Sequence, residues 1–168
     1  MRKIDIKTVI YLGVLTALEI VLNRFMSINA WNIKIGFNFV PIVIAAIMFG
    51  PIHAAIVAAL GDFMGAILFP IGAYFPGFTL TAFITGAVFG LFLHKEQTLM
   101  RTVLSVCIVQ LILGLLLNSY WISVLYGSPY GPLLATRIIQ CAIIGPVQVL
   151  VIQLISRVMT TYGKRLFA

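Results

Sequence analysis

The chain has 168 residues, of which 62% are hydrophobic and 9% are charged, and its mean hydropathy is +1.14. These values lie far outside the range of soluble globular domains, so they indicate an integral membrane protein, and the length suits one domain over residues 1–168. The net charge of +7 would suggest a nucleic-acid partner in a soluble chain. In a membrane protein it marks the cytoplasmic face, and we expect membrane lipid and no nucleic acid around this chain.

Six apolar segments follow one another along the chain, each long enough or nearly long enough to cross a hydrocarbon core about 30 Å thick. They cover residues 8–25, 37–51, 53–69, 77–93, 100–122 and 133–160. The first resembles a signal sequence, but no small-residue cleavage site follows it, so we expect it to be retained. Gly50 and Pro51 provide a stop and a restart between the second and third segments, which predicts a tight turn. The predicted fold is therefore all-α, a bundle of six transmembrane helices.

The basic residues predict the orientation of this bundle, because Lys and Arg gather on the cytoplasmic side of a membrane. Eight of the eleven fall on one side of the predicted layout, which also holds both termini: Arg2, Lys3, Lys7, Lys95, Arg101, Arg157, Lys164 and Arg165. We therefore expect the N- and C-termini to be cytoplasmic. The remaining three, Arg24, Lys34 and Arg137, fall on the outer side or in the outer half, with Arg137 about one turn inside the last helix.

Three cations on the outer side suggest an anionic partner, because an arginine drawn into the bilayer costs a few kcal/mol. Arg24 and Lys34 could instead cap helix ends and reach the lipid headgroups. Asp62 lies ~10 Å below the same surface, where a lone carboxylate must be paired, protonated or used. It could form an ion pair with Arg137 or a hydrogen bond to a neighbouring helix. It could instead accept hydrogen bonds from the donor edge of a polar ligand, or do each in turn. Glu19 fits a structural role better.

Aromatic side chains gather in two segments at the outer side. Residues 69–79 read FPIGAYFPGFT, and residues 118–131 read NSYWISVLYGSPYG. The usual interfacial belt of Trp and Tyr explains Trp121 well. It explains the first segment poorly, because anchoring does not need a backbone fixed by Pro and Gly. A preshaped cover of aromatic faces suits a flat ring system, so we expect an outward-facing pocket.

The motifs that the chain lacks narrow its function. It has no Walker motif, no dense metal-ligand cluster and no Ser-His-Asp arrangement, so we expect no enzyme, no metal and no cofactor. It also lacks the inverted repeats and broken helices of secondary transporters. A binding subunit that takes its energy from partner proteins fits better. Gly13 and Ala17 lie four residues apart on the first helix, where small residues permit the close approach of a partner helix or tight internal packing.

Several stretches resemble the substrate-binding S component of energy-coupling factor (ECF) vitamin transporters, folate type. They are NRFMSI, KIGFNFVPIVIAAIMFGP, ALGDFMGAILFPIGAYFPGFTLTAFITGAVFGLF and NSYWISVLYGSPYGPLLATRIIQ. The resemblance implies a six-helix fold in a bacterial plasma membrane. It implies capture of folate, or a related anionic pterin, from outside and delivery with a T component and two cytoplasmic ATPases. That family meets the T component through an Ala-x-x-x-Ala pattern on helix one, which Gly13 and Ala17 match in size.

Folate joins a flat pterin ring with a donor edge to an aminobenzoate and a glutamate with two carboxylates. Asp62 or Asn38 would read the donor edge, and Arg24, Lys34 or Arg137 would meet the carboxylates. Aromatic residues would flank the rings: Phe39, Tyr74, Phe75, Phe78, Tyr120 and Trp121. Two alternatives remain open: an S component for another vitamin, such as pantothenate or a thiamine precursor, and a structural membrane protein whose aromatics form only the interfacial belt.

Overall fold

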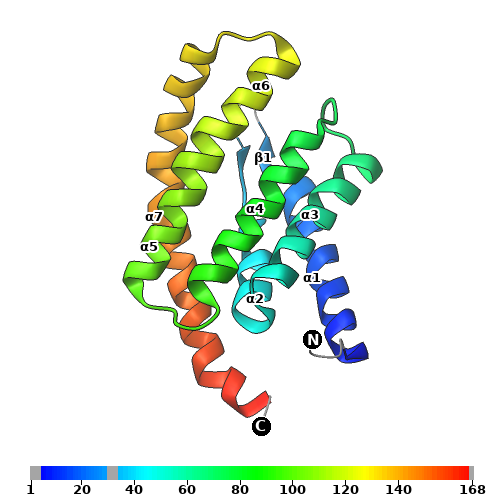
Figure 1. The fold of residues 1–168 in the computed structure, drawn as a ribbon, viewed down its shortest axis with the longest axis vertical. Helices are drawn as coiled ribbons and strands as arrows, with labels where there is room; N and C mark the ends of the chain where they lie inside the picture. The colour runs from blue at the N-terminus through cyan, green and yellow to red at the C-terminus, as the bar shows by residue number, and fades with distance from the viewer. Residues whose placement is uncertain (1–4, 30–33, 167–168) are drawn as a thin grey trace.

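A computed structural model describes residues 5–29 and 34–166 of the chain (Figure 1). The first helix, α1 (Ile6–Arg24), leads into two paired strands of two residues each, β1 (Ile28–Asn29) and β2 (Lys34–Ile35). Three helices follow: α2 (Phe39–Phe49), α3 (Pro51–Leu68) and α4 (Pro76–Leu93). A continuous helical rod is then built from α5 (Leu99–Cys107), the π-helix η1 (Ile108–Leu117) and α6 (Asn118–Tyr126). The last helix is α7 (Tyr130–Leu166).

Five of these rods are long and apolar enough to cross a membrane, and α2 is not. With 11 residues, α2 is about 16 Å long, roughly half the hydrocarbon thickness. Its side chains are buried or half-buried throughout, and Val43, Ala45 and Ala46 are fully buried. The other helices of the bundle therefore cover most of this segment. Five candidate spans and one shorter apolar helix fit the predicted six-helix fold, and residues 37–51 supply that shorter helix.

The turn between α2 and α3 is the tight one that the sequence predicts. Gly50 has φ 87°, a conformation that glycine adopts without strain, and Pro51 begins α3, where its missing N–H needs no helical partner. Both predicted C-terminal spans are longer than expected. The α5–η1–α6 rod continues to Tyr126, where Gly127 ends it with φ 63°. Helix α7 begins at Tyr130 because Pro132 is tolerated in a first turn. Arg137 therefore lies two turns inside α7, and the prediction of one turn is wrong.

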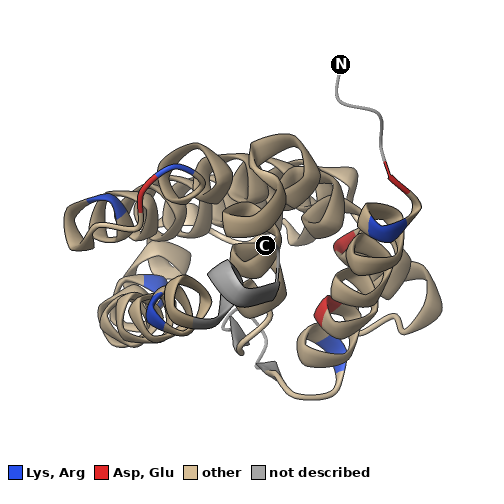
Figure 2. Ribbon diagram, turned by 90° about the horizontal axis from the view of Figure 1, so that it is seen from below, with Lys and Arg blue, Asp and Glu red and all other residues tan. Residues whose placement is uncertain are grey.

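Helices α3 and α4 pack closely against each other because glycines of α4 let the backbones approach. A Cβ atom on Gly86 would meet the backbone of Ala54, and one on Gly90 would meet Pro51. Helix α1 packs against α3, while α7 packs along the α5–η1–α6 rod. The α3–α4 loop and the α6–α7 turn lie at one end of the bundle, and the α2–α3 turn lies at the other with the start of α1 (Figure 1). Few positions on these helices carry charge (Figure 2).

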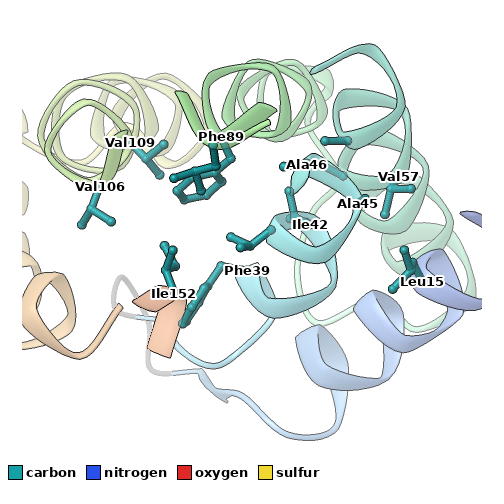
Figure 3. Close-up of a cluster of buried hydrophobic side chains, with 14 of the residues drawn as sticks. Leu15, Phe39, Ile42, Ala45, Ala46, Val57, Phe89, Val106, Val109 and Ile152 are labelled. Atoms are coloured by element: carbon teal, nitrogen blue, oxygen red, sulfur yellow. The ribbon is translucent and has the colours of Figure 1, made fainter. Parts of the chain in front are cut away.

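The apolar core sits around α2, between α4, the α5–η1 segment and α7 (Figure 3). Phe89 and Ile152 are fully buried there, and Phe39 and Ile42 of α2 point toward them. Four core side chains also line a cavity on the side of the α3–α4 loop: Phe39, Ile42, Val109 and Leu113. The core therefore forms the floor of that cavity.

Candidate functional site

A cavity of about 430 Å³ opens among α1, α3, α4, the rod and α7, above the N-terminus of α2. This volume falls in the range of small-molecule sites. Eight of the eleven ligand-binding residues proposed from the sequence lie in its wall: Arg24, Asn38, Phe39, Asp62, Tyr74, Phe75, Phe78 and Arg137. The fold brings them together from five different helices and the α3–α4 loop.

The other three residues lie elsewhere. Lys34 is in β2, where it pairs with Asn29 of β1, and its side chain lies outside the described part of the structure. Tyr120 is half exposed, at 52%, on the outside of α6 and packs on the ring of Trp121. Neither Tyr120 nor Trp121 is among the cavity-lining residues.

Trp121 supports the cavity wall from behind. Its ring packs on Phe75 with 5.4 Å between the ring centroids, and its Nε1 donates to Thr81 Oγ1 at 3.1 Å. Thr81 in turn donates to the carbonyl of Gly77 at 2.9 Å. A Cβ atom on Gly77 would lie within 2.8 Å of both the Phe75 and Trp121 rings, so only glycine fits there. The indole thereby fixes the start of α4 and the Phe75 ring that faces the cavity.

The α3–α4 loop forms the cover over the cavity, as the sequence predicts. Ile71, Gly72, Ala73, Tyr74 and Phe75 all line the space beneath it. Tyr74 stands edge-on to Phe63 of α3, and Phe75 stands edge-on to Phe78 of α4. Edge-to-face pairs of this kind favour a defined ring orientation. The cover is thus tied to both flanking helices.

Two arginines reach the cavity from different helices. Arg24 ends α1 and lies over Gly65 of α3, where a Cβ atom would come within 2.9 Å of its Nε. Arg137 of α7 donates from Nη1 to the carbonyl of Gly114 at 2.8 Å. In both side chains the Nε is buried and has no hydrogen-bond partner among the described residues. Buried donors of this kind are costly unless another acceptor meets them.

Asp62 does not pair with Arg137, so the ion-pair interpretation is wrong. In the described residues, the one ion pair between a basic and an acidic side chain is Arg101 with Glu96, at 3.1 Å on the surface. Asp62 instead accepts a hydrogen bond from Thr79 Oγ1 at 2.9 Å, while Arg137 is held by a backbone carbonyl. Each of these two charged groups therefore has one local polar partner, while the Nε of Arg137 still lacks an acceptor among the described residues.

Glu19 lines the cavity, although the sequence analysis assigned it a structural role. The side chain is 2% exposed, and its Oε1 accepts from Asn23 Nδ2 at 2.9 Å. A Cβ atom on Gly61 of α3 would collide with this carboxylate. Asn23 lies one turn after Glu19 on α1 and Arg24 follows it directly. This group of polar residues on a mainly apolar helix is the signal that could have placed Glu19 in the site.

A wall of amide side chains was also missed. Gln110 donates to Gln148 Oε1 at 2.7 Å, and Asn118 and Gln140 line the same side of the cavity. On α7 the polar positions 137, 140, 141 and 148 follow a helical period and could have been recognised.

The rod is harder to read, because Val109 and Asn118 both line the cavity at a separation of nine residues. Nine residues make two and a half turns of an α-helix, so an α-helical pattern would place these two side chains on opposite faces. In a π-helix, with about 4.4 residues per turn, nine residues are close to two full turns, so the two side chains share one face.

Gly13 and Ala17 lie on the outer face of α1, away from the cavity. Both are exposed, and a Cβ atom on Gly13 would have no atom within 4 Å. Exposed apolar side chains surround them on the same helix, including Val9, Ile10 and Val14. The alternative that this pair serves internal packing is therefore wrong for the described structure. Among the described residues, no group of three or more His, Cys, Asp or Glu could hold a metal ion.

The model of the ECF-type riboflavin transporter S-component family matches residues 3–162. The chain belongs to this family of ECF transporter S components. It is thus a multi-pass membrane protein of a transporter family and not of an enzyme family.

The relatives of this S component include two folate transporters. It is 40% identical over 153 residues to the folate transporter FolT of Clostridium novyi. The matched region covers 90% of this chain and 88% of the relative. It is 31% identical over 154 residues to FolT of Leuconostoc mesenteroides, covering 88% and 83%.

Two solved structures share the fold of this S component. A crystal structure of FolT bound with folic acid matches with a TM-score of 0.87 and 34% identity, covering 91% of this chain and 94% of that one. The structure of the S component of a bacterial ECF transporter matches with a TM-score of 0.71 and 26% identity, covering 94% and 98%. The described helices therefore have the arrangement that S components share.

Proposed function

We propose that this S component binds folate from the extracellular side and delivers it with a T component and two cytoplasmic ATPases. The observation that carries the proposal is the cavity, which combines a fixed aromatic cover with two arginines whose buried Nε atoms have no hydrogen-bond partner in the part of the chain that the structure describes. An anionic ligand with a flat ring would satisfy both features. The 40% identity to one FolT and the structural match to FolT bound with folic acid support the same ligand.

The parts of the folate molecule match different parts of the cavity. The pterin ring would lie among Phe39, Tyr74, Phe75 and Phe78, with its donor edge on Asp62 or Asn38. The glutamate carboxylates would meet Arg24 or Arg137. Lys34, in the strand β2 that follows α1, would be a further cation for them. Trp121 would support the ring of Phe75 from behind the cover, and Tyr120 would in turn support the ring of Trp121.

Riboflavin is the second candidate, because the matching family model carries its name. Riboflavin also has a flat ring system, so the aromatic cover would suit it. It has no charge, however, and would leave the two arginines of the cavity without an anion. Pantothenate has a carboxylate but no ring, so it would leave the aromatic cover unused. Folate uses both features of the cavity.

The orientation and partners follow from charge and exposed surface. We infer that both termini are cytoplasmic, that the cavity faces outside a bacterial cell membrane and that residues 1–168 form one domain. The basic residues at the end that carries Arg101 and Arg157 support this orientation. The exposed face of α1 around Gly13 and Ala17 would contact the T component, because small residues permit close helix packing.

Equilibrium dialysis of the purified chain in detergent, with folic acid, riboflavin and pantothenate as separate ligands, tests the proposed ligand. We expect saturable binding of folic acid at one site per chain and much weaker binding of the other two. Saturable binding of riboflavin without binding of folic acid would assign the cavity to the second candidate. An absence of saturable binding for all three would favour a structural role.

A further inference from the structure

Three polar side chains form a hydrogen-bonded chain beside the cavity cover. Thr79 Oγ1 donates to Asp62 Oδ2 at 2.9 Å, and the Tyr74 hydroxyl lies 3.3 Å from Thr79 Oγ1. Tyr74 belongs to the α3–α4 loop, Thr79 to the first turn of α4 and Asp62 to α3. Tyr74 and Asp62 line the cavity, whereas Thr79 does not. Thr79 is therefore placed to act on the site through its two neighbours.

The direction of these hydrogen bonds is determined by the chemistry of the three groups. An ionised carboxylate accepts only, and a threonine hydroxyl has one proton to donate. Since Thr79 donates that proton to Asp62, its oxygen is left as the acceptor of the Tyr74 proton. The order of donation thus runs from the loop through α4 to α3, and every proton in it points away from the cavity cover and toward the carboxylate.

We propose that Thr79 is a positioning residue that holds the Asp62 carboxylate in one orientation, so that the cavity presents an acceptor and selects heterocycles with a donor edge. This inference rests on the proposed binding of a pterin. A pterin has an amino group beside a ring N–H, and a fixed carboxylate can accept from both. Lumazine has a carbonyl oxygen in place of the amino group. A fixed carboxylate would face this oxygen, which is also an acceptor, so the two groups would repel each other.

Binding measurements on the Thr79→Val and Thr79→Ser variants test this role. Valine keeps the shape of threonine and removes the hydroxyl, whereas serine keeps the hydroxyl. We expect Thr79→Val to weaken folic acid binding by about tenfold, in line with the loss of a hydrogen bond to a charged group. Thr79→Ser should stay within about twofold of the unchanged protein. The matched control is Thr161→Val in the C-terminal part of α7. It removes an exposed hydroxyl that donates to the Arg157 carbonyl, far from the cavity.

The preference for pterin over lumazine separates positioning from a general loss of stability. We expect this preference to fall in Thr79→Val and to persist in Tyr74→Phe, because Thr79 can still donate to Asp62 without the tyrosine hydroxyl. The double variant Thr79→Val with Asp62→Asn should bind folic acid no more weakly than Asp62→Asn alone, since Thr79 acts through that carboxylate. An unchanged preference in Thr79→Val, or additive losses in the double variant, would overturn the proposal.

Hydrogen exchange in the ligand-free protein keeps this test separate from the proposed function. Peptides covering residues 69–76 should exchange faster in Thr79→Val than in Thr79→Ser, because the loop loses its tie to α3. If the unchanged protein binds no folic acid but the exchange rates differ as expected, the folate proposal fails while the hydrogen-bonded chain stands. Equal exchange rates in the two variants would refute the proposal that the hydrogen bonds from Tyr74 through Thr79 to Asp62 hold the loop.

Discussion

At the scale of single residues, charged groups in this bundle are balanced by neutral polar neighbours. Asp62 accepts from Thr79, Glu19 accepts from Asn23, and Arg137 donates to the Gly114 carbonyl. A charge inside a membrane protein costs several kcal/mol unless it is compensated. One local hydrogen bond lowers that cost but leaves further donor or acceptor capacity at the cavity wall. This arrangement suits residues that must be stable alone and still bind a ligand.

The first prediction separates the arginines from the ring-binding part of the site. Arg24→Gln and Arg137→Gln should each weaken folic acid binding by about 10- to 100-fold, because a charge-assisted hydrogen bond to a carboxylate is lost. Binding of free pterin, which has no carboxylate, should change less than about threefold. Dissociation constants from equilibrium dialysis give the comparison, and Arg157→Gln on the far part of α7 is the control. Equal losses for both ligands would place the arginines beside the ring.

At the scale of elements, helix contacts depend on glycines that the sequence does not distinguish from one another. Gly86 and Gly90 lie against the backbone of Ala54 and Pro51, whereas Gly13 faces open space. The first two permit close packing of α3 and α4, the helices that flank the cavity cover. The third leaves α1 available to a partner. The same residue type therefore serves internal packing in one helix and an external surface in another.

The second prediction compares glycines of these two kinds. Gly86→Ala should destabilise the isolated chain by about 1 to 3 kcal/mol, because the added Cβ forces α3 and α4 apart. Gly13→Ala should leave stability unchanged or raise it slightly, since alanine is the better helix former and nothing obstructs it. Thermal unfolding in detergent measures both. A melting temperature for Gly86→Ala equal to that of Gly13→Ala would show that the close approach is not needed.

At the scale of the whole molecule, the chain combines a cavity between its helices with an exposed apolar flank on α1. The cavity is built by contacts within the chain, whereas the flank has no partner in the described part of the fold. This division is expected of a subunit that binds its ligand alone and depends on other proteins for transport. It separates binding variants from assembly variants.

The third prediction uses that separation. Gly13→Trp or Ala17→Trp should reduce assembly with the T component, because a bulky ring would prevent close helix approach. Folic acid binding by the isolated chain should remain within about twofold, since both positions lie outside the cavity. Copurification of the complex and dialysis of the isolated chain are the two readouts. Leu154→Trp, at a position of α7 that is also exposed, is the control. Loss of ligand binding by the isolated variants would contradict the assignment.

The fourth prediction concerns energy. Reconstituted alone in proteoliposomes, the chain should bind folic acid without concentrating it, because its sequence has no Walker motif and no evident ion pathway. Addition of the T component and the ATPases with ATP should allow accumulation. Radiolabelled folic acid inside the vesicles is the measurement. Accumulation above the outside concentration by the chain alone would assign it a transport mechanism of its own.

Much of the fold was determined by the sequence alone. Apolar runs long enough to cross a bilayer require helices, because the backbone groups must be satisfied within each segment. Gly50 with Pro51 and the Pro-rich and Gly-rich residues 69–79 interrupt those runs, so the tight turn and the cavity cover could be predicted. Eight of the residues that line the cavity were singled out for the same reason, because polar or aromatic residues at one end of apolar helices have few other roles.

Only the tertiary structure decided which neighbours these residues have. The sequence did not show that α2 is enclosed by protein, that Glu19 faces the cavity or that Trp121 stands behind Phe75. Apolar composition is the same for burial in lipid and burial in protein, and the π-helical turns of η1 change which residues share a face. Asp62 bonds to Thr79, 17 residues away along the chain, because α3 and α4 pack side by side. Such pairing depends on distance in space, which a local pattern of residues does not contain.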